Sequence, residues 1–316
     1  MRVFLMYFVV HVDTGNEWRG GQKQVQLLAA SLVTRGVSTA VACPKDSPLS
    51  QSLKPLNVPL IDIPSGNSIR TPWILSRIST RLFAAHTAHA HNCCLPFSQR
   101  LIVHRRVDFA PKNHWKYRKP KAYIAVSEAV RAIVANATRA PIYVVPDGVD
   151  EVPPQPPATD APDVLAVGAL VNHKGHRYLS QAAAFLSGID IAVAGEGPLR
   201  YPHLRYLGFR NDIPSLMAGA KVFVHPSVEE GMGQVLIEAM LSKIPIVATT
   251  AGGIPETLAE HATLVPPREP KALVKAIQSV LSGAHPSVEK AYRYAKTCLS
   301  VERMVERTLS VYRETL

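Results

Sequence analysis

The chain has 316 residues, of which 47% are apolar or aromatic and 19% are charged. This balance excludes an intrinsically disordered chain, and the length predicts two domains, each large enough to bury a core without cross-links. The four cysteines form no C-x-x-C pair, which argues against a zinc ribbon or a redox motif and fits a reducing cytosol.

The positive charge lies in the first half of the chain. Residues 1–150 hold 19 Lys and Arg against 8 Asp and Glu, a balance of +11, whereas the rest of the chain holds 16 of each. This asymmetry predicts an acidic partner for the first half: nucleic acid, an anionic membrane surface or an anionic substrate. A charge that serves only solubility is the alternative.

The first half alternates predicted strands and helices. Val3–Val10 is too short to cross a membrane and lacks the cleavage site of a signal peptide, so it predicts a buried strand. A glycine turn at Gly20-Gly21 follows, and then a helix over Gln22–Arg35 with its apolar residues on one face. Further strands are predicted at Thr39–Cys43, Leu60–Ile63, Ala85–Ala90, Leu101–Val103, Tyr123–Val126 and Tyr143–Val145, with helices that include Pro72–Phe83 and Ser127–Ala137.

A proline-rich segment separates the two halves. Glu151–Pro162 reads EVPPQPPATDAP, and because proline fixes the backbone and removes donors, this segment predicts a linker. Strands are then predicted at Val164–Val167, Asp190–Ala194, Arg205–Leu207, Val222–Val224, Ile246–Ala248 and Thr263–Val265. The helices between them are predicted at Tyr178–Leu186, Ile213–Ala218, Gln234–Leu241, Pro255–Ala259 and Lys271–Leu281.

This alternation predicts an α/β protein with two Rossmann-like domains, each built on a parallel sheet with crossover helices. The expected domains are residues 1–150 and 151–299, with the last helices, at about 300–316, packing back on the first domain. Ligands bind at the carboxyl ends of the strands in this architecture, so we expect the site in a central cleft that faces both sheets.

The segment with the strongest chemical signal is His225–Met240, HPSVEEGMGQVLIEAM. It follows a predicted strand, and its glycines Gly231 and Gly233 let backbone N–H groups approach a ligand closely. The helix that starts near Gln234 directs its positive end to the same place, which predicts a phosphate site. Glu230 and Glu238 are eight residues apart, so one carboxylate can contact a sugar and the other a ribose. Two acidic residues on a solvated helix face are the alternative.

This segment resembles the E-x7-E motif of the retaining GT-B glycosyltransferases of family four, glycosyl transferases group 1, which include lipopolysaccharide-type enzymes. Further segments agree in order and spacing in the second half: VGALVNHKG, VAGEGPLR, LGFRNDIPSLM and PIVATTAGGIPE. The first half matches less sharply, through EWRGGQKQVQLLAASLVTRG, HAHN, VHRRVDF and AVSEAVR. The resemblance implies a GT-B fold, in which the second domain binds a nucleotide-diphosphate sugar and the first binds the acceptor.

The resemblance also implies roles for single residues. Glu230 would bind hydroxyls of the donor sugar, Glu238 would bind both ribose hydroxyls, and Lys174 would neutralise the diphosphate as charge builds on the leaving group. The rest of the implied donor site consists of the backbone N–H groups of Met232, Gly233, Gln234 and Val235, the glycines Gly20 and Gly21, and Phe209 and Arg210 beside the base. Family members commonly have Gly-Arg where this chain has Gly168-Ala169, so Lys174 or another basic residue must compensate for a missing cation.

Four histidines, His86, His89, His91 and His104, lie close together in the first half. On a strand His89 and His91 would share one face and His86 the other, so they converge poorly on a metal ion. His104 follows a predicted strand and resembles the catalytic histidine that many family members place beside the sugar, with His91 as the second choice. A structural histidine is the alternative for both.

A basic stretch with aromatic residues follows His104. It consists of Arg105, Arg106, Lys112, Lys116, Arg118, Lys119 and Lys121, with Trp115 and Tyr117 among them. Such a stretch suits a membrane interface or an anionic acceptor, it suits nucleic acid equally, and a merely solvated face remains the alternative.

The resemblance implies a retaining hexosyltransferase. We expect it to be metal-independent and to need no cofactor, because a lysine and a helix end take the place of a metal. The expected acceptor is a glycan or glycolipid, such as lipopolysaccharide core or another surface polysaccharide. The expected location is the cytoplasm, with peripheral attachment to the inner face of the membrane. The alternatives are a nucleotide-sugar epimerase of GT-B shape and a nucleic-acid-binding protein, and the second would leave Glu230 and Glu238 without a role.

Overall fold

The computed structural model describes residues 6–111, 114–151 and 153–316. The chain forms two compact units. Unit 1 consists of Met1–Gly148 together with Val301–Leu316, and unit 2 consists of Val149–Ser300. The last segment of the chain therefore belongs to the same unit as the first.

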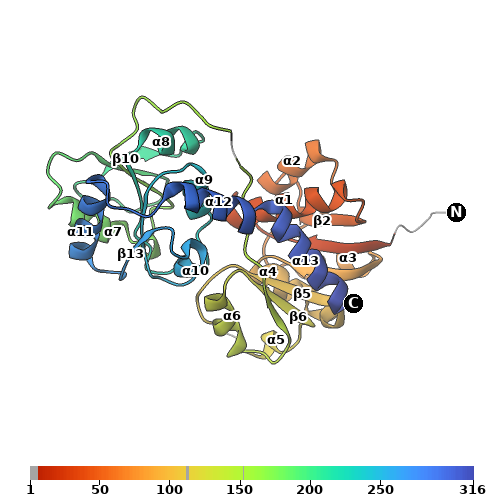
Figure 1. Ribbon diagram of the computed structural model, residues 1–316. Coiled ribbons are helices and arrows are strands. Elements are labelled where there is room, and N and C mark those ends of the chain that lie inside the picture. The colour runs from red at the N-terminus through yellow and green to blue at the C-terminus, as the bar shows by residue number, and fades with distance from the viewer. Residues whose placement is uncertain (1–5, 112–113, 152) are drawn as a thin grey trace. The chain divides into compact units, whose positions relative to one another are not determined.

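Unit 1 is built on a seven-stranded parallel sheet in the order β3-β2-β1-β4-β5-β6-β7. Its strands are β1 Tyr7–Val12, β2 Thr39–Pro44, β3 Leu60–Ile63, β4 Thr80–Ala85, β5 Leu101–Arg105, β6 Ala122–Ala125 and β7 Ile142–Val144 (Figure 1). Its helices are α1 Gly20–Thr34, α2 Pro48–Leu53, α3 Arg70–Ser76, α4 Ala88–Cys94, α5 His114–Tyr117, α6 Glu128–Ala135 and α13 Val301–Thr315.

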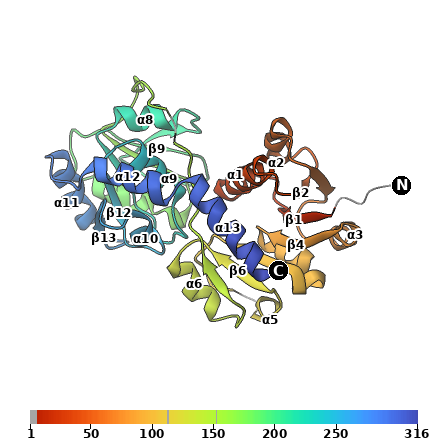
Figure 2. The ribbon, with the colours of Figure 1, turned by 45° about the vertical axis from the view of Figure 1, so that its right-hand side comes forward.

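The last helix completes the core of unit 1. α13 runs beside α1, as both ribbon views show (Figures 1 and 2). Its residues Val305 and Tyr312 are fully buried, and they join one apolar cluster with Leu28 of α1 and Ile102 of β5. Residues more than 200 positions apart thus form one core, which explains why the C-terminal segment is part of this unit.

Unit 2 is built on a six-stranded parallel sheet in the order β10-β9-β8-β11-β12-β13. Its strands are β8 Val164–Val167, β9 Ile191–Ala194, β10 Arg205–Gly208, β11 Val222–His225, β12 Ile246–Thr249 and β13 Thr263–Val265. Its helices are α7 His176–Ala183, α8 Ile213–Gly219, α9 Gln234–Leu241, α10 Ile254–Leu258, α11 Pro270–Leu281 and α12 Val288–Cys298.

The central strands of unit 2 are short apolar runs. Every residue of β9, β11 and β12 is buried, as expected for parallel strands that are covered on both faces. One face packs on α7 and α11 through a cluster that includes Leu179 and Ile277. The described part of the segment Glu151–Pro162 forms neither helix nor strand, which agrees with its high proline content.

Two predicted elements of unit 1 are wrong. The predicted strand Ala85–Ala90 is in fact the end of β4 followed by α4, and the predicted helix Pro72–Phe83 ends at Ser76 and gives way to β4. Thr87 is the reason for the first error, because its hydroxyl accepts a hydrogen bond from the Ala90 amide and caps a helix. Of the predicted first strand, residues 3–5 lie outside the described residues, and β1 extends to Val12.

Candidate functional site

The predicted donor residues of unit 2 lie in loops and in helix α9 at the carboxyl edge of its sheet. Because the strands are parallel, the loops that follow β8, β9, β10, β11 and β12 all leave the same edge. Lys174 lies in a 3-10 turn after β8, and Glu230 lies in the loop between β11 and α9. The fold therefore brings together two residues that are 56 positions apart.

Glycine lets these loops pack backbone against backbone. Gly175 has a φ of +70°, and a Cβ at this position would lie 1.9 Å from the carbonyl oxygen of Pro226. The amide of Val228 also donates to the carbonyl of His173 over 2.8 Å. The loop after β8 is thus fixed directly against the loop after β11, and only glycine fits at the contact.

Glu230 is the centre of a polar network. Its Oε2 lies 2.6 Å from Nζ of Lys174 and 2.9 Å from Nε2 of His225, the last residue of β11. The hydroxyl of Ser227 donates to the same oxygen over 3.3 Å. The side chains of Lys174 and Glu230 are only 21% and 13% exposed, so this ion pair is largely shielded from water.

The contacts in this network determine the protonation states of Glu230 and His225. Burial disfavours the charged form of Glu230, but the hydrogen bond from His225 and the charge of Lys174 outweigh it and hold the pKa of Glu230 well below its ordinary value. Burial lowers the pKa of His225, although its contact with Glu230 opposes this shift. At neutral pH a carboxylate therefore accepts the Nε2–H of a neutral imidazole, and Glu230 is suited to accept hydrogen bonds rather than to donate a proton.

The loop between Glu230 and α9 presents a helix start at the same edge. Gly233 caps α9 with a φ of +84°, which favours glycine. The amide of Gly253 donates to the Glu230 carbonyl over 2.9 Å, and the Thr257 hydroxyl donates to the Met232 carbonyl over 2.8 Å. The loop that precedes α9 is therefore held at Glu230 and at Met232, which fixes the position of the positive end of the helix.

The second acidic residue of the motif, Glu238, lies about one turn into α9 and is exposed. Its neighbours Ile237 and Ala239 are completely buried. The helix thus turns its apolar face to the core and leaves this carboxylate at the surface.

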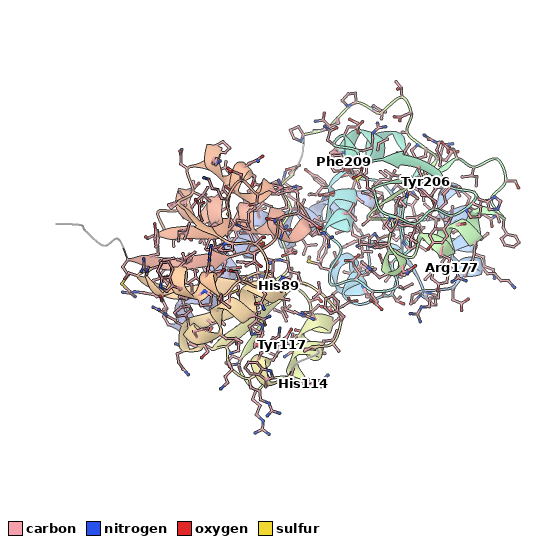
Figure 3. The ribbon with its side chains drawn as sticks, turned by 180° about the vertical axis from the view of Figure 1, so that it is seen from behind. His89, His114, Tyr117, Arg177, Tyr206 and Phe209 are labelled. Atoms are coloured by element: carbon pink, nitrogen blue, oxygen red, sulfur yellow. The ribbon has the colours of Figure 1, made fainter. Side chains whose placement is uncertain are left out.

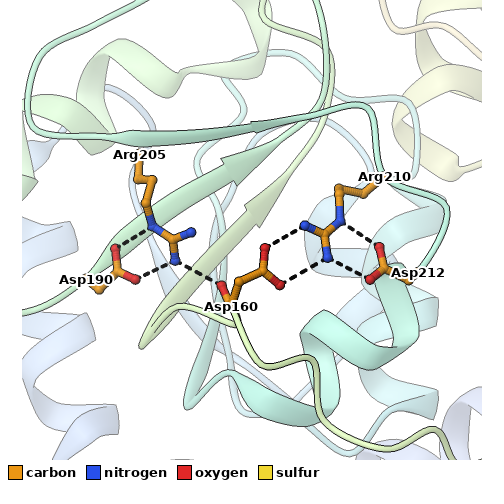
Figure 4. Close-up of polar contacts among 5 residues, drawn as sticks. All are labelled: Asp160, Asp190, Arg205, Arg210 and Asp212. Atoms are coloured by element: carbon orange, nitrogen blue, oxygen red, sulfur yellow. Dashed lines mark hydrogen bonds and ion pairs between the residues drawn. The ribbon is translucent and has the colours of Figure 1, made fainter.

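Phe209 and Arg210, the residues expected beside the base, follow β10. The ring of Phe209 is 72% exposed (Figure 3). The guanidinium of Arg210 lies between two carboxylates, 2.6 Å from Asp160 and 2.7 Å from Asp212 (Figure 4). Arg210 therefore ties the end of the linker to the loop after β10, and its contact with a base stays a prediction.

In unit 1 the glycines predicted to contact the donor are the first two residues of α1. A Cβ at Gly21 would meet no atom of the described residues within 4 Å, so packing among those residues does not require glycine there. Asp13, at the end of the preceding strand, is buried and accepts hydrogen bonds from Gln22 and from the Gly15 amide. These bonds set the path of the chain into the helix.

The predicted catalytic histidine His104 lies in a cluster of buried polar side chains. Its Nε2 is 2.8 Å from the hydroxyl of Tyr312 in α13, and its ring stacks on His86 at 4.3 Å. His86 also contacts His11 over 2.9 Å and Arg106 over 3.1 Å. Burial lowers the pKa of all three histidines, that of His11 to about 3, so the three imidazoles are neutral at physiological pH.

His91, the second choice, lies apart from this cluster. It is on α4 and not on a strand, and its ring meets the edge of Tyr117 at 5.2 Å. Burial lowers its pKa to about 4. The expectation that His89 and His91 share the face of a strand is therefore wrong, because both are helical and only His86 follows β4.

A cavity of about 620 Å³ lies wholly within unit 1. Its lining includes His86 and His104 from the histidine cluster, His91 from α4, and the two consecutive arginines Arg105 and Arg106. His89 and Tyr117 line it as well (Figure 3). Arg106, at the wall of this cavity, forms a salt bridge of 2.9 Å with Asp147, a contact that no sequence motif indicated.

The basic stretch after His104 is divided by its environment. Tyr117 is buried and stacks on Tyr123, whereas Trp115 is 62% exposed. Arg118, Lys119 and Lys121 are exposed beside it, and Lys112 lies outside the described residues. Only part of the stretch therefore forms a basic and aromatic surface.

The described residues contain neither a metal-binding cluster nor a membrane-spanning helix. No group of three or more His, Cys, Asp or Glu side chains among them is arranged to hold a metal ion. No helix in the described ranges is both long enough and apolar enough to cross a membrane.

The chain is similar in sequence to known glycosyltransferases. Residues 161–283 match the family model described as Glycosyl transferases group 1. The 2-deoxystreptamine glucosyltransferase of Streptomyces kanamyceticus is 28% identical over 211 residues, which cover 55% of this chain and 54% of that protein. The lipopolysaccharide core biosynthesis glycosyltransferase LpsE of Rhizobium meliloti is 30% identical over 106 residues, covering 30% and 31%. The chain thus spans about half the length, or less, of the curated relatives that it matches.

Solved structures share the fold over nearly the whole chain. The crystal structure of Anabaena HepE in complex with UDP aligns with a TM-score of 0.82 at 19% identity, covering 97% of this chain and all of that one. The lipopolysaccharide outer core galactosyltransferase WaaB aligns with a TM-score of 0.76 at 14% identity, covering 98% and 100%. At these identities the likeness shows the fold.

Proposed function

We propose that the chain, whose residues 161–283 match the glycosyl transferases group 1 model and which has the GT-B fold, is a retaining glycosyltransferase of that family. It moves a sugar from a nucleotide-diphosphate sugar to a glycan or glycolipid acceptor. The observation that carries this proposal is the largely buried Glu230 carboxylate, held by Lys174 and His225 next to the start of α9.

Each part of this edge has a partner in the donor. The backbone N–H groups of Met232, Gly233, Gln234 and Val235 and the positive end of α9 suit the diphosphate. Lys174 supplies a cationic side chain to the Glu230 network, and it would share its charge between Glu230 and the leaving diphosphate. Glu230 accepts hydrogen bonds from hydroxyls of the sugar, and Glu238, exposed on α9, accepts those of the ribose.

The chemistry proceeds on one face of the donor sugar. The acceptor oxygen forms the bond to the anomeric carbon, and the bond from that carbon to the phosphate oxygen breaks. The proton of the acceptor hydroxyl passes to a donor phosphate oxygen on the same face. Glu230 is ionised and hydrogen-bonded to two nitrogens, which suits a role in binding rather than as acid or nucleophile. Lysine and the helix end carry the charge, so the proposal includes no metal and no cofactor.

The acceptor side of the reaction is proposed for unit 1, whose first glycines, Gly20 and Gly21, would lie against donor and acceptor. His104 and His91 remain the candidates for the residue beside the sugar. His104 would need to turn away from Tyr312 to use its Nε2, whereas the Nε2 of His91 has no hydrogen-bond partner among the described residues.

We propose a lipopolysaccharide core or another surface polysaccharide as the acceptor, and the inner membrane face as the place of reaction. The exposed Trp115 with Arg118, Lys119 and Lys121 provides a basic and aromatic surface for anionic lipid headgroups. Flotation with anionic liposomes should show binding that weakens as salt is added. Absence of salt-sensitive binding would remove the membrane from the proposal and leave the transfer reaction standing.

The donor is tested by thermal-shift measurements with UDP, GDP, ADP and their sugars. One of these should raise the unfolding temperature, because a ligand that binds only the folded state stabilises it. Glu238→Ala should abolish the response to the best ligand. Glu229→Ala is the matched control, because this exposed neighbour of Glu230 has no part in the proposed site, and its response should equal that of the wild type.

A nucleotide-sugar epimerase of the same fold is an alternative to this proposal. An epimerase converts the donor alone, whereas a transferase requires the acceptor for synthetic turnover. Product analysis with and without acceptor distinguishes the two.

A further inference from the structure

Three arginines line the cavity of unit 1: Arg19, Arg105 and Arg106. Two of them have carboxylate partners, because Arg106 pairs with Asp147 over 2.9 Å and Arg19 pairs with Glu17. Arg105 takes part in none of the salt bridges between described residues. The cavity therefore has one positive charge that is not neutralised by direct contact within the described part of the chain.

Arg105 is also the most deeply buried of the three, at 7% exposure. It ends β5, and its Nη2 donates to the carbonyl of Phe109 over 2.5 Å, while its Nε has no hydrogen-bond partner among the described residues. The rings of Phe109 and Tyr117 lie 4.8 and 6.0 Å from the guanidinium. Most of the side chain is thus enclosed by aromatic and backbone groups, with few polar contacts.

A guanidinium keeps its charge in such surroundings. Burial lowers the pKa of Arg105, opposed by electrostatic interaction with Tyr117 and Asp108, yet arginine is not deprotonated in proteins. A buried charge without a counter-ion is costly, and a buried donor without a partner indicates a missing contact. An oxyanion satisfies both needs, since its oxygens accept from the guanidinium and carry the opposite charge.

The rest of the cavity suits a hydroxylated molecule. His91 is neutral, its Nε2 has no partner among the described residues, and Thr14 and Ser65 add hydroxyl groups to the wall. The volume of about 620 Å³ is of the size that holds a small ligand. We propose that this cavity holds the acceptor through a phosphate or carboxylate group that Arg105 binds, so that the acceptor of the reaction is an anionic sugar. This inference rests on the proposed function.

The test is isothermal titration of the full chain at fixed ionic strength with glucose 6-phosphate, glucuronate, inorganic phosphate and neutral glucose. The wild type should bind glucose 6-phosphate or glucuronate, and should bind glucose at least tenfold more weakly. Arg105→Gln should weaken binding of the anionic sugar at least tenfold. Arg139→Gln, which removes an exposed arginine of the same unit, should leave it unchanged.

Three results would overturn the inference. Wild type that binds neither anionic sugar is the first. Equal binding by wild type and a folded Arg105→Gln is the second. The third is a tenfold loss of UDP or UDP-sugar binding in Arg105→Gln, which would assign the arginine to the donor phosphates instead.

Two further measurements keep the test decisive. If Arg105→Gln does not fold, crystals of the wild type soaked with glucose 6-phosphate must show the phosphate in hydrogen-bond contact with Arg105, and its absence there contradicts the inference. Donor binding by the wild type is measured separately. A wild type that binds no nucleotide sugar refutes the proposed function, whereas donor binding without anionic-sugar binding refutes only the inference.

Discussion

Glu230 receives contacts from two nitrogens and a hydroxyl, and this determines what it can do. A carboxylate in that setting stays ionised and offers its remaining lone pairs as acceptors, which matches the hydroxyl groups of a sugar. The same contacts hold Lys174 in place, ready to meet a diphosphate. The ion pair with Lys174 therefore preorganises the site at the residue scale, before any donor binds.

The ion pair has a measurable effect on stability. Glu230→Gln removes the charge and keeps the shape, so at pH 7 it should lower the free energy of unfolding by about 1–3 kcal/mol. The pKa of Glu230 is lowered by folding, so its stabilisation is complete above the ordinary value of 4.5 and is lost as the pH falls from there toward the folded pKa. Urea unfolding of both proteins at pH 7, 5.5, 4 and 3 should show the difference shrinking only below about pH 5.

Glu229→Gln is the control for this series. Its side chain is exposed and next in sequence, so the free energy of unfolding should match that of the wild type at each pH. A gap between wild type and Glu230→Gln that persists unchanged at pH 3 would contradict the lowered pKa.

The contacts of single residues were predictable only where a motif carried them. The glycines and the two glutamates after β11 marked one edge of a sheet, and the position of Lys174 came from the order of neighbouring segments. Contacts such as His104 with Tyr312, which are 208 residues apart, have no local signal. The pair Arg106 and Asp147 is another example, since neither residue lies in a motif that points to the other.

At the scale of elements, α4 shows where periodicity misleads. The alternation in Ala85–Ala90, which reads AHTAHA, is compatible with a strand, because short apolar stretches fit both periods. In the structure β4 ends at Ala85 and Thr87 caps a helix, so the residues from Ala88 onward are helical. The second unit was predicted more closely, because its central strands β8, β9, β11 and β12 are largely apolar runs bounded by glycine or proline.

The contact between Gly175 and the Pro226 carbonyl can be tested by comparing an alanine substitution at Gly175 with one at Gly188. Gly175→Ala would place a methyl group on the Pro226 carbonyl, so it should destabilise the protein by roughly 3 kcal/mol or more and weaken donor binding. Gly188 has a similar φ of +78°, but a Cβ there would meet no described atom within 4 Å, so Gly188→Ala should cost about 1 kcal/mol. Urea unfolding of the two variants separates steric conflict from backbone strain, and equal losses would show that the contact with Pro226 is absent.

The hydroxyls of Tyr312 and Tyr143 each form a hydrogen bond that involves α13. The bond of Tyr312 is buried, and the bond of Tyr143 is exposed. Tyr312→Phe leaves the buried His104 Nε2 without its partner at 2.8 Å, so it should cost about 1–3 kcal/mol. Tyr143→Phe removes a bond to Glu314 of α13 at the surface and should cost less than about 0.5 kcal/mol. Thermal unfolding of both variants measures the difference, and a neutral Tyr312→Phe would mean that His104 finds another partner.

At the scale of the whole molecule, sequence order and structural unit do not coincide. The proline-rich segment marks the end of the first stretch of unit 1, but the return of Val301–Leu316 is decided by burial of its apolar face. Val301, Met304 and Val305 join the core of unit 1, so this unit is incomplete without residues that follow unit 2 in the chain. Unit 2, by contrast, is one continuous segment, Val149–Ser300.

This difference predicts how fragments behave. A fragment of residues 149–300 holds every strand of its sheet and both helices of its main cluster, so it should fold cooperatively and bind the nucleotide that the full chain binds. A fragment of residues 1–148 lacks α13 and exposes the apolar residues of α1 and β5 that pack on it, so it should aggregate or unfold without a sharp transition.

Joining residues 301–316 to the end of the fragment 1–148 through a flexible linker should restore a cooperative transition, because α13 then covers the exposed apolar residues of this core. Circular dichroism and calorimetry of the three fragments measure this. A cooperative transition in residues 1–148 alone would show that α13 covers a core that is already stable. In that case unit 1 would not require α13 in order to fold.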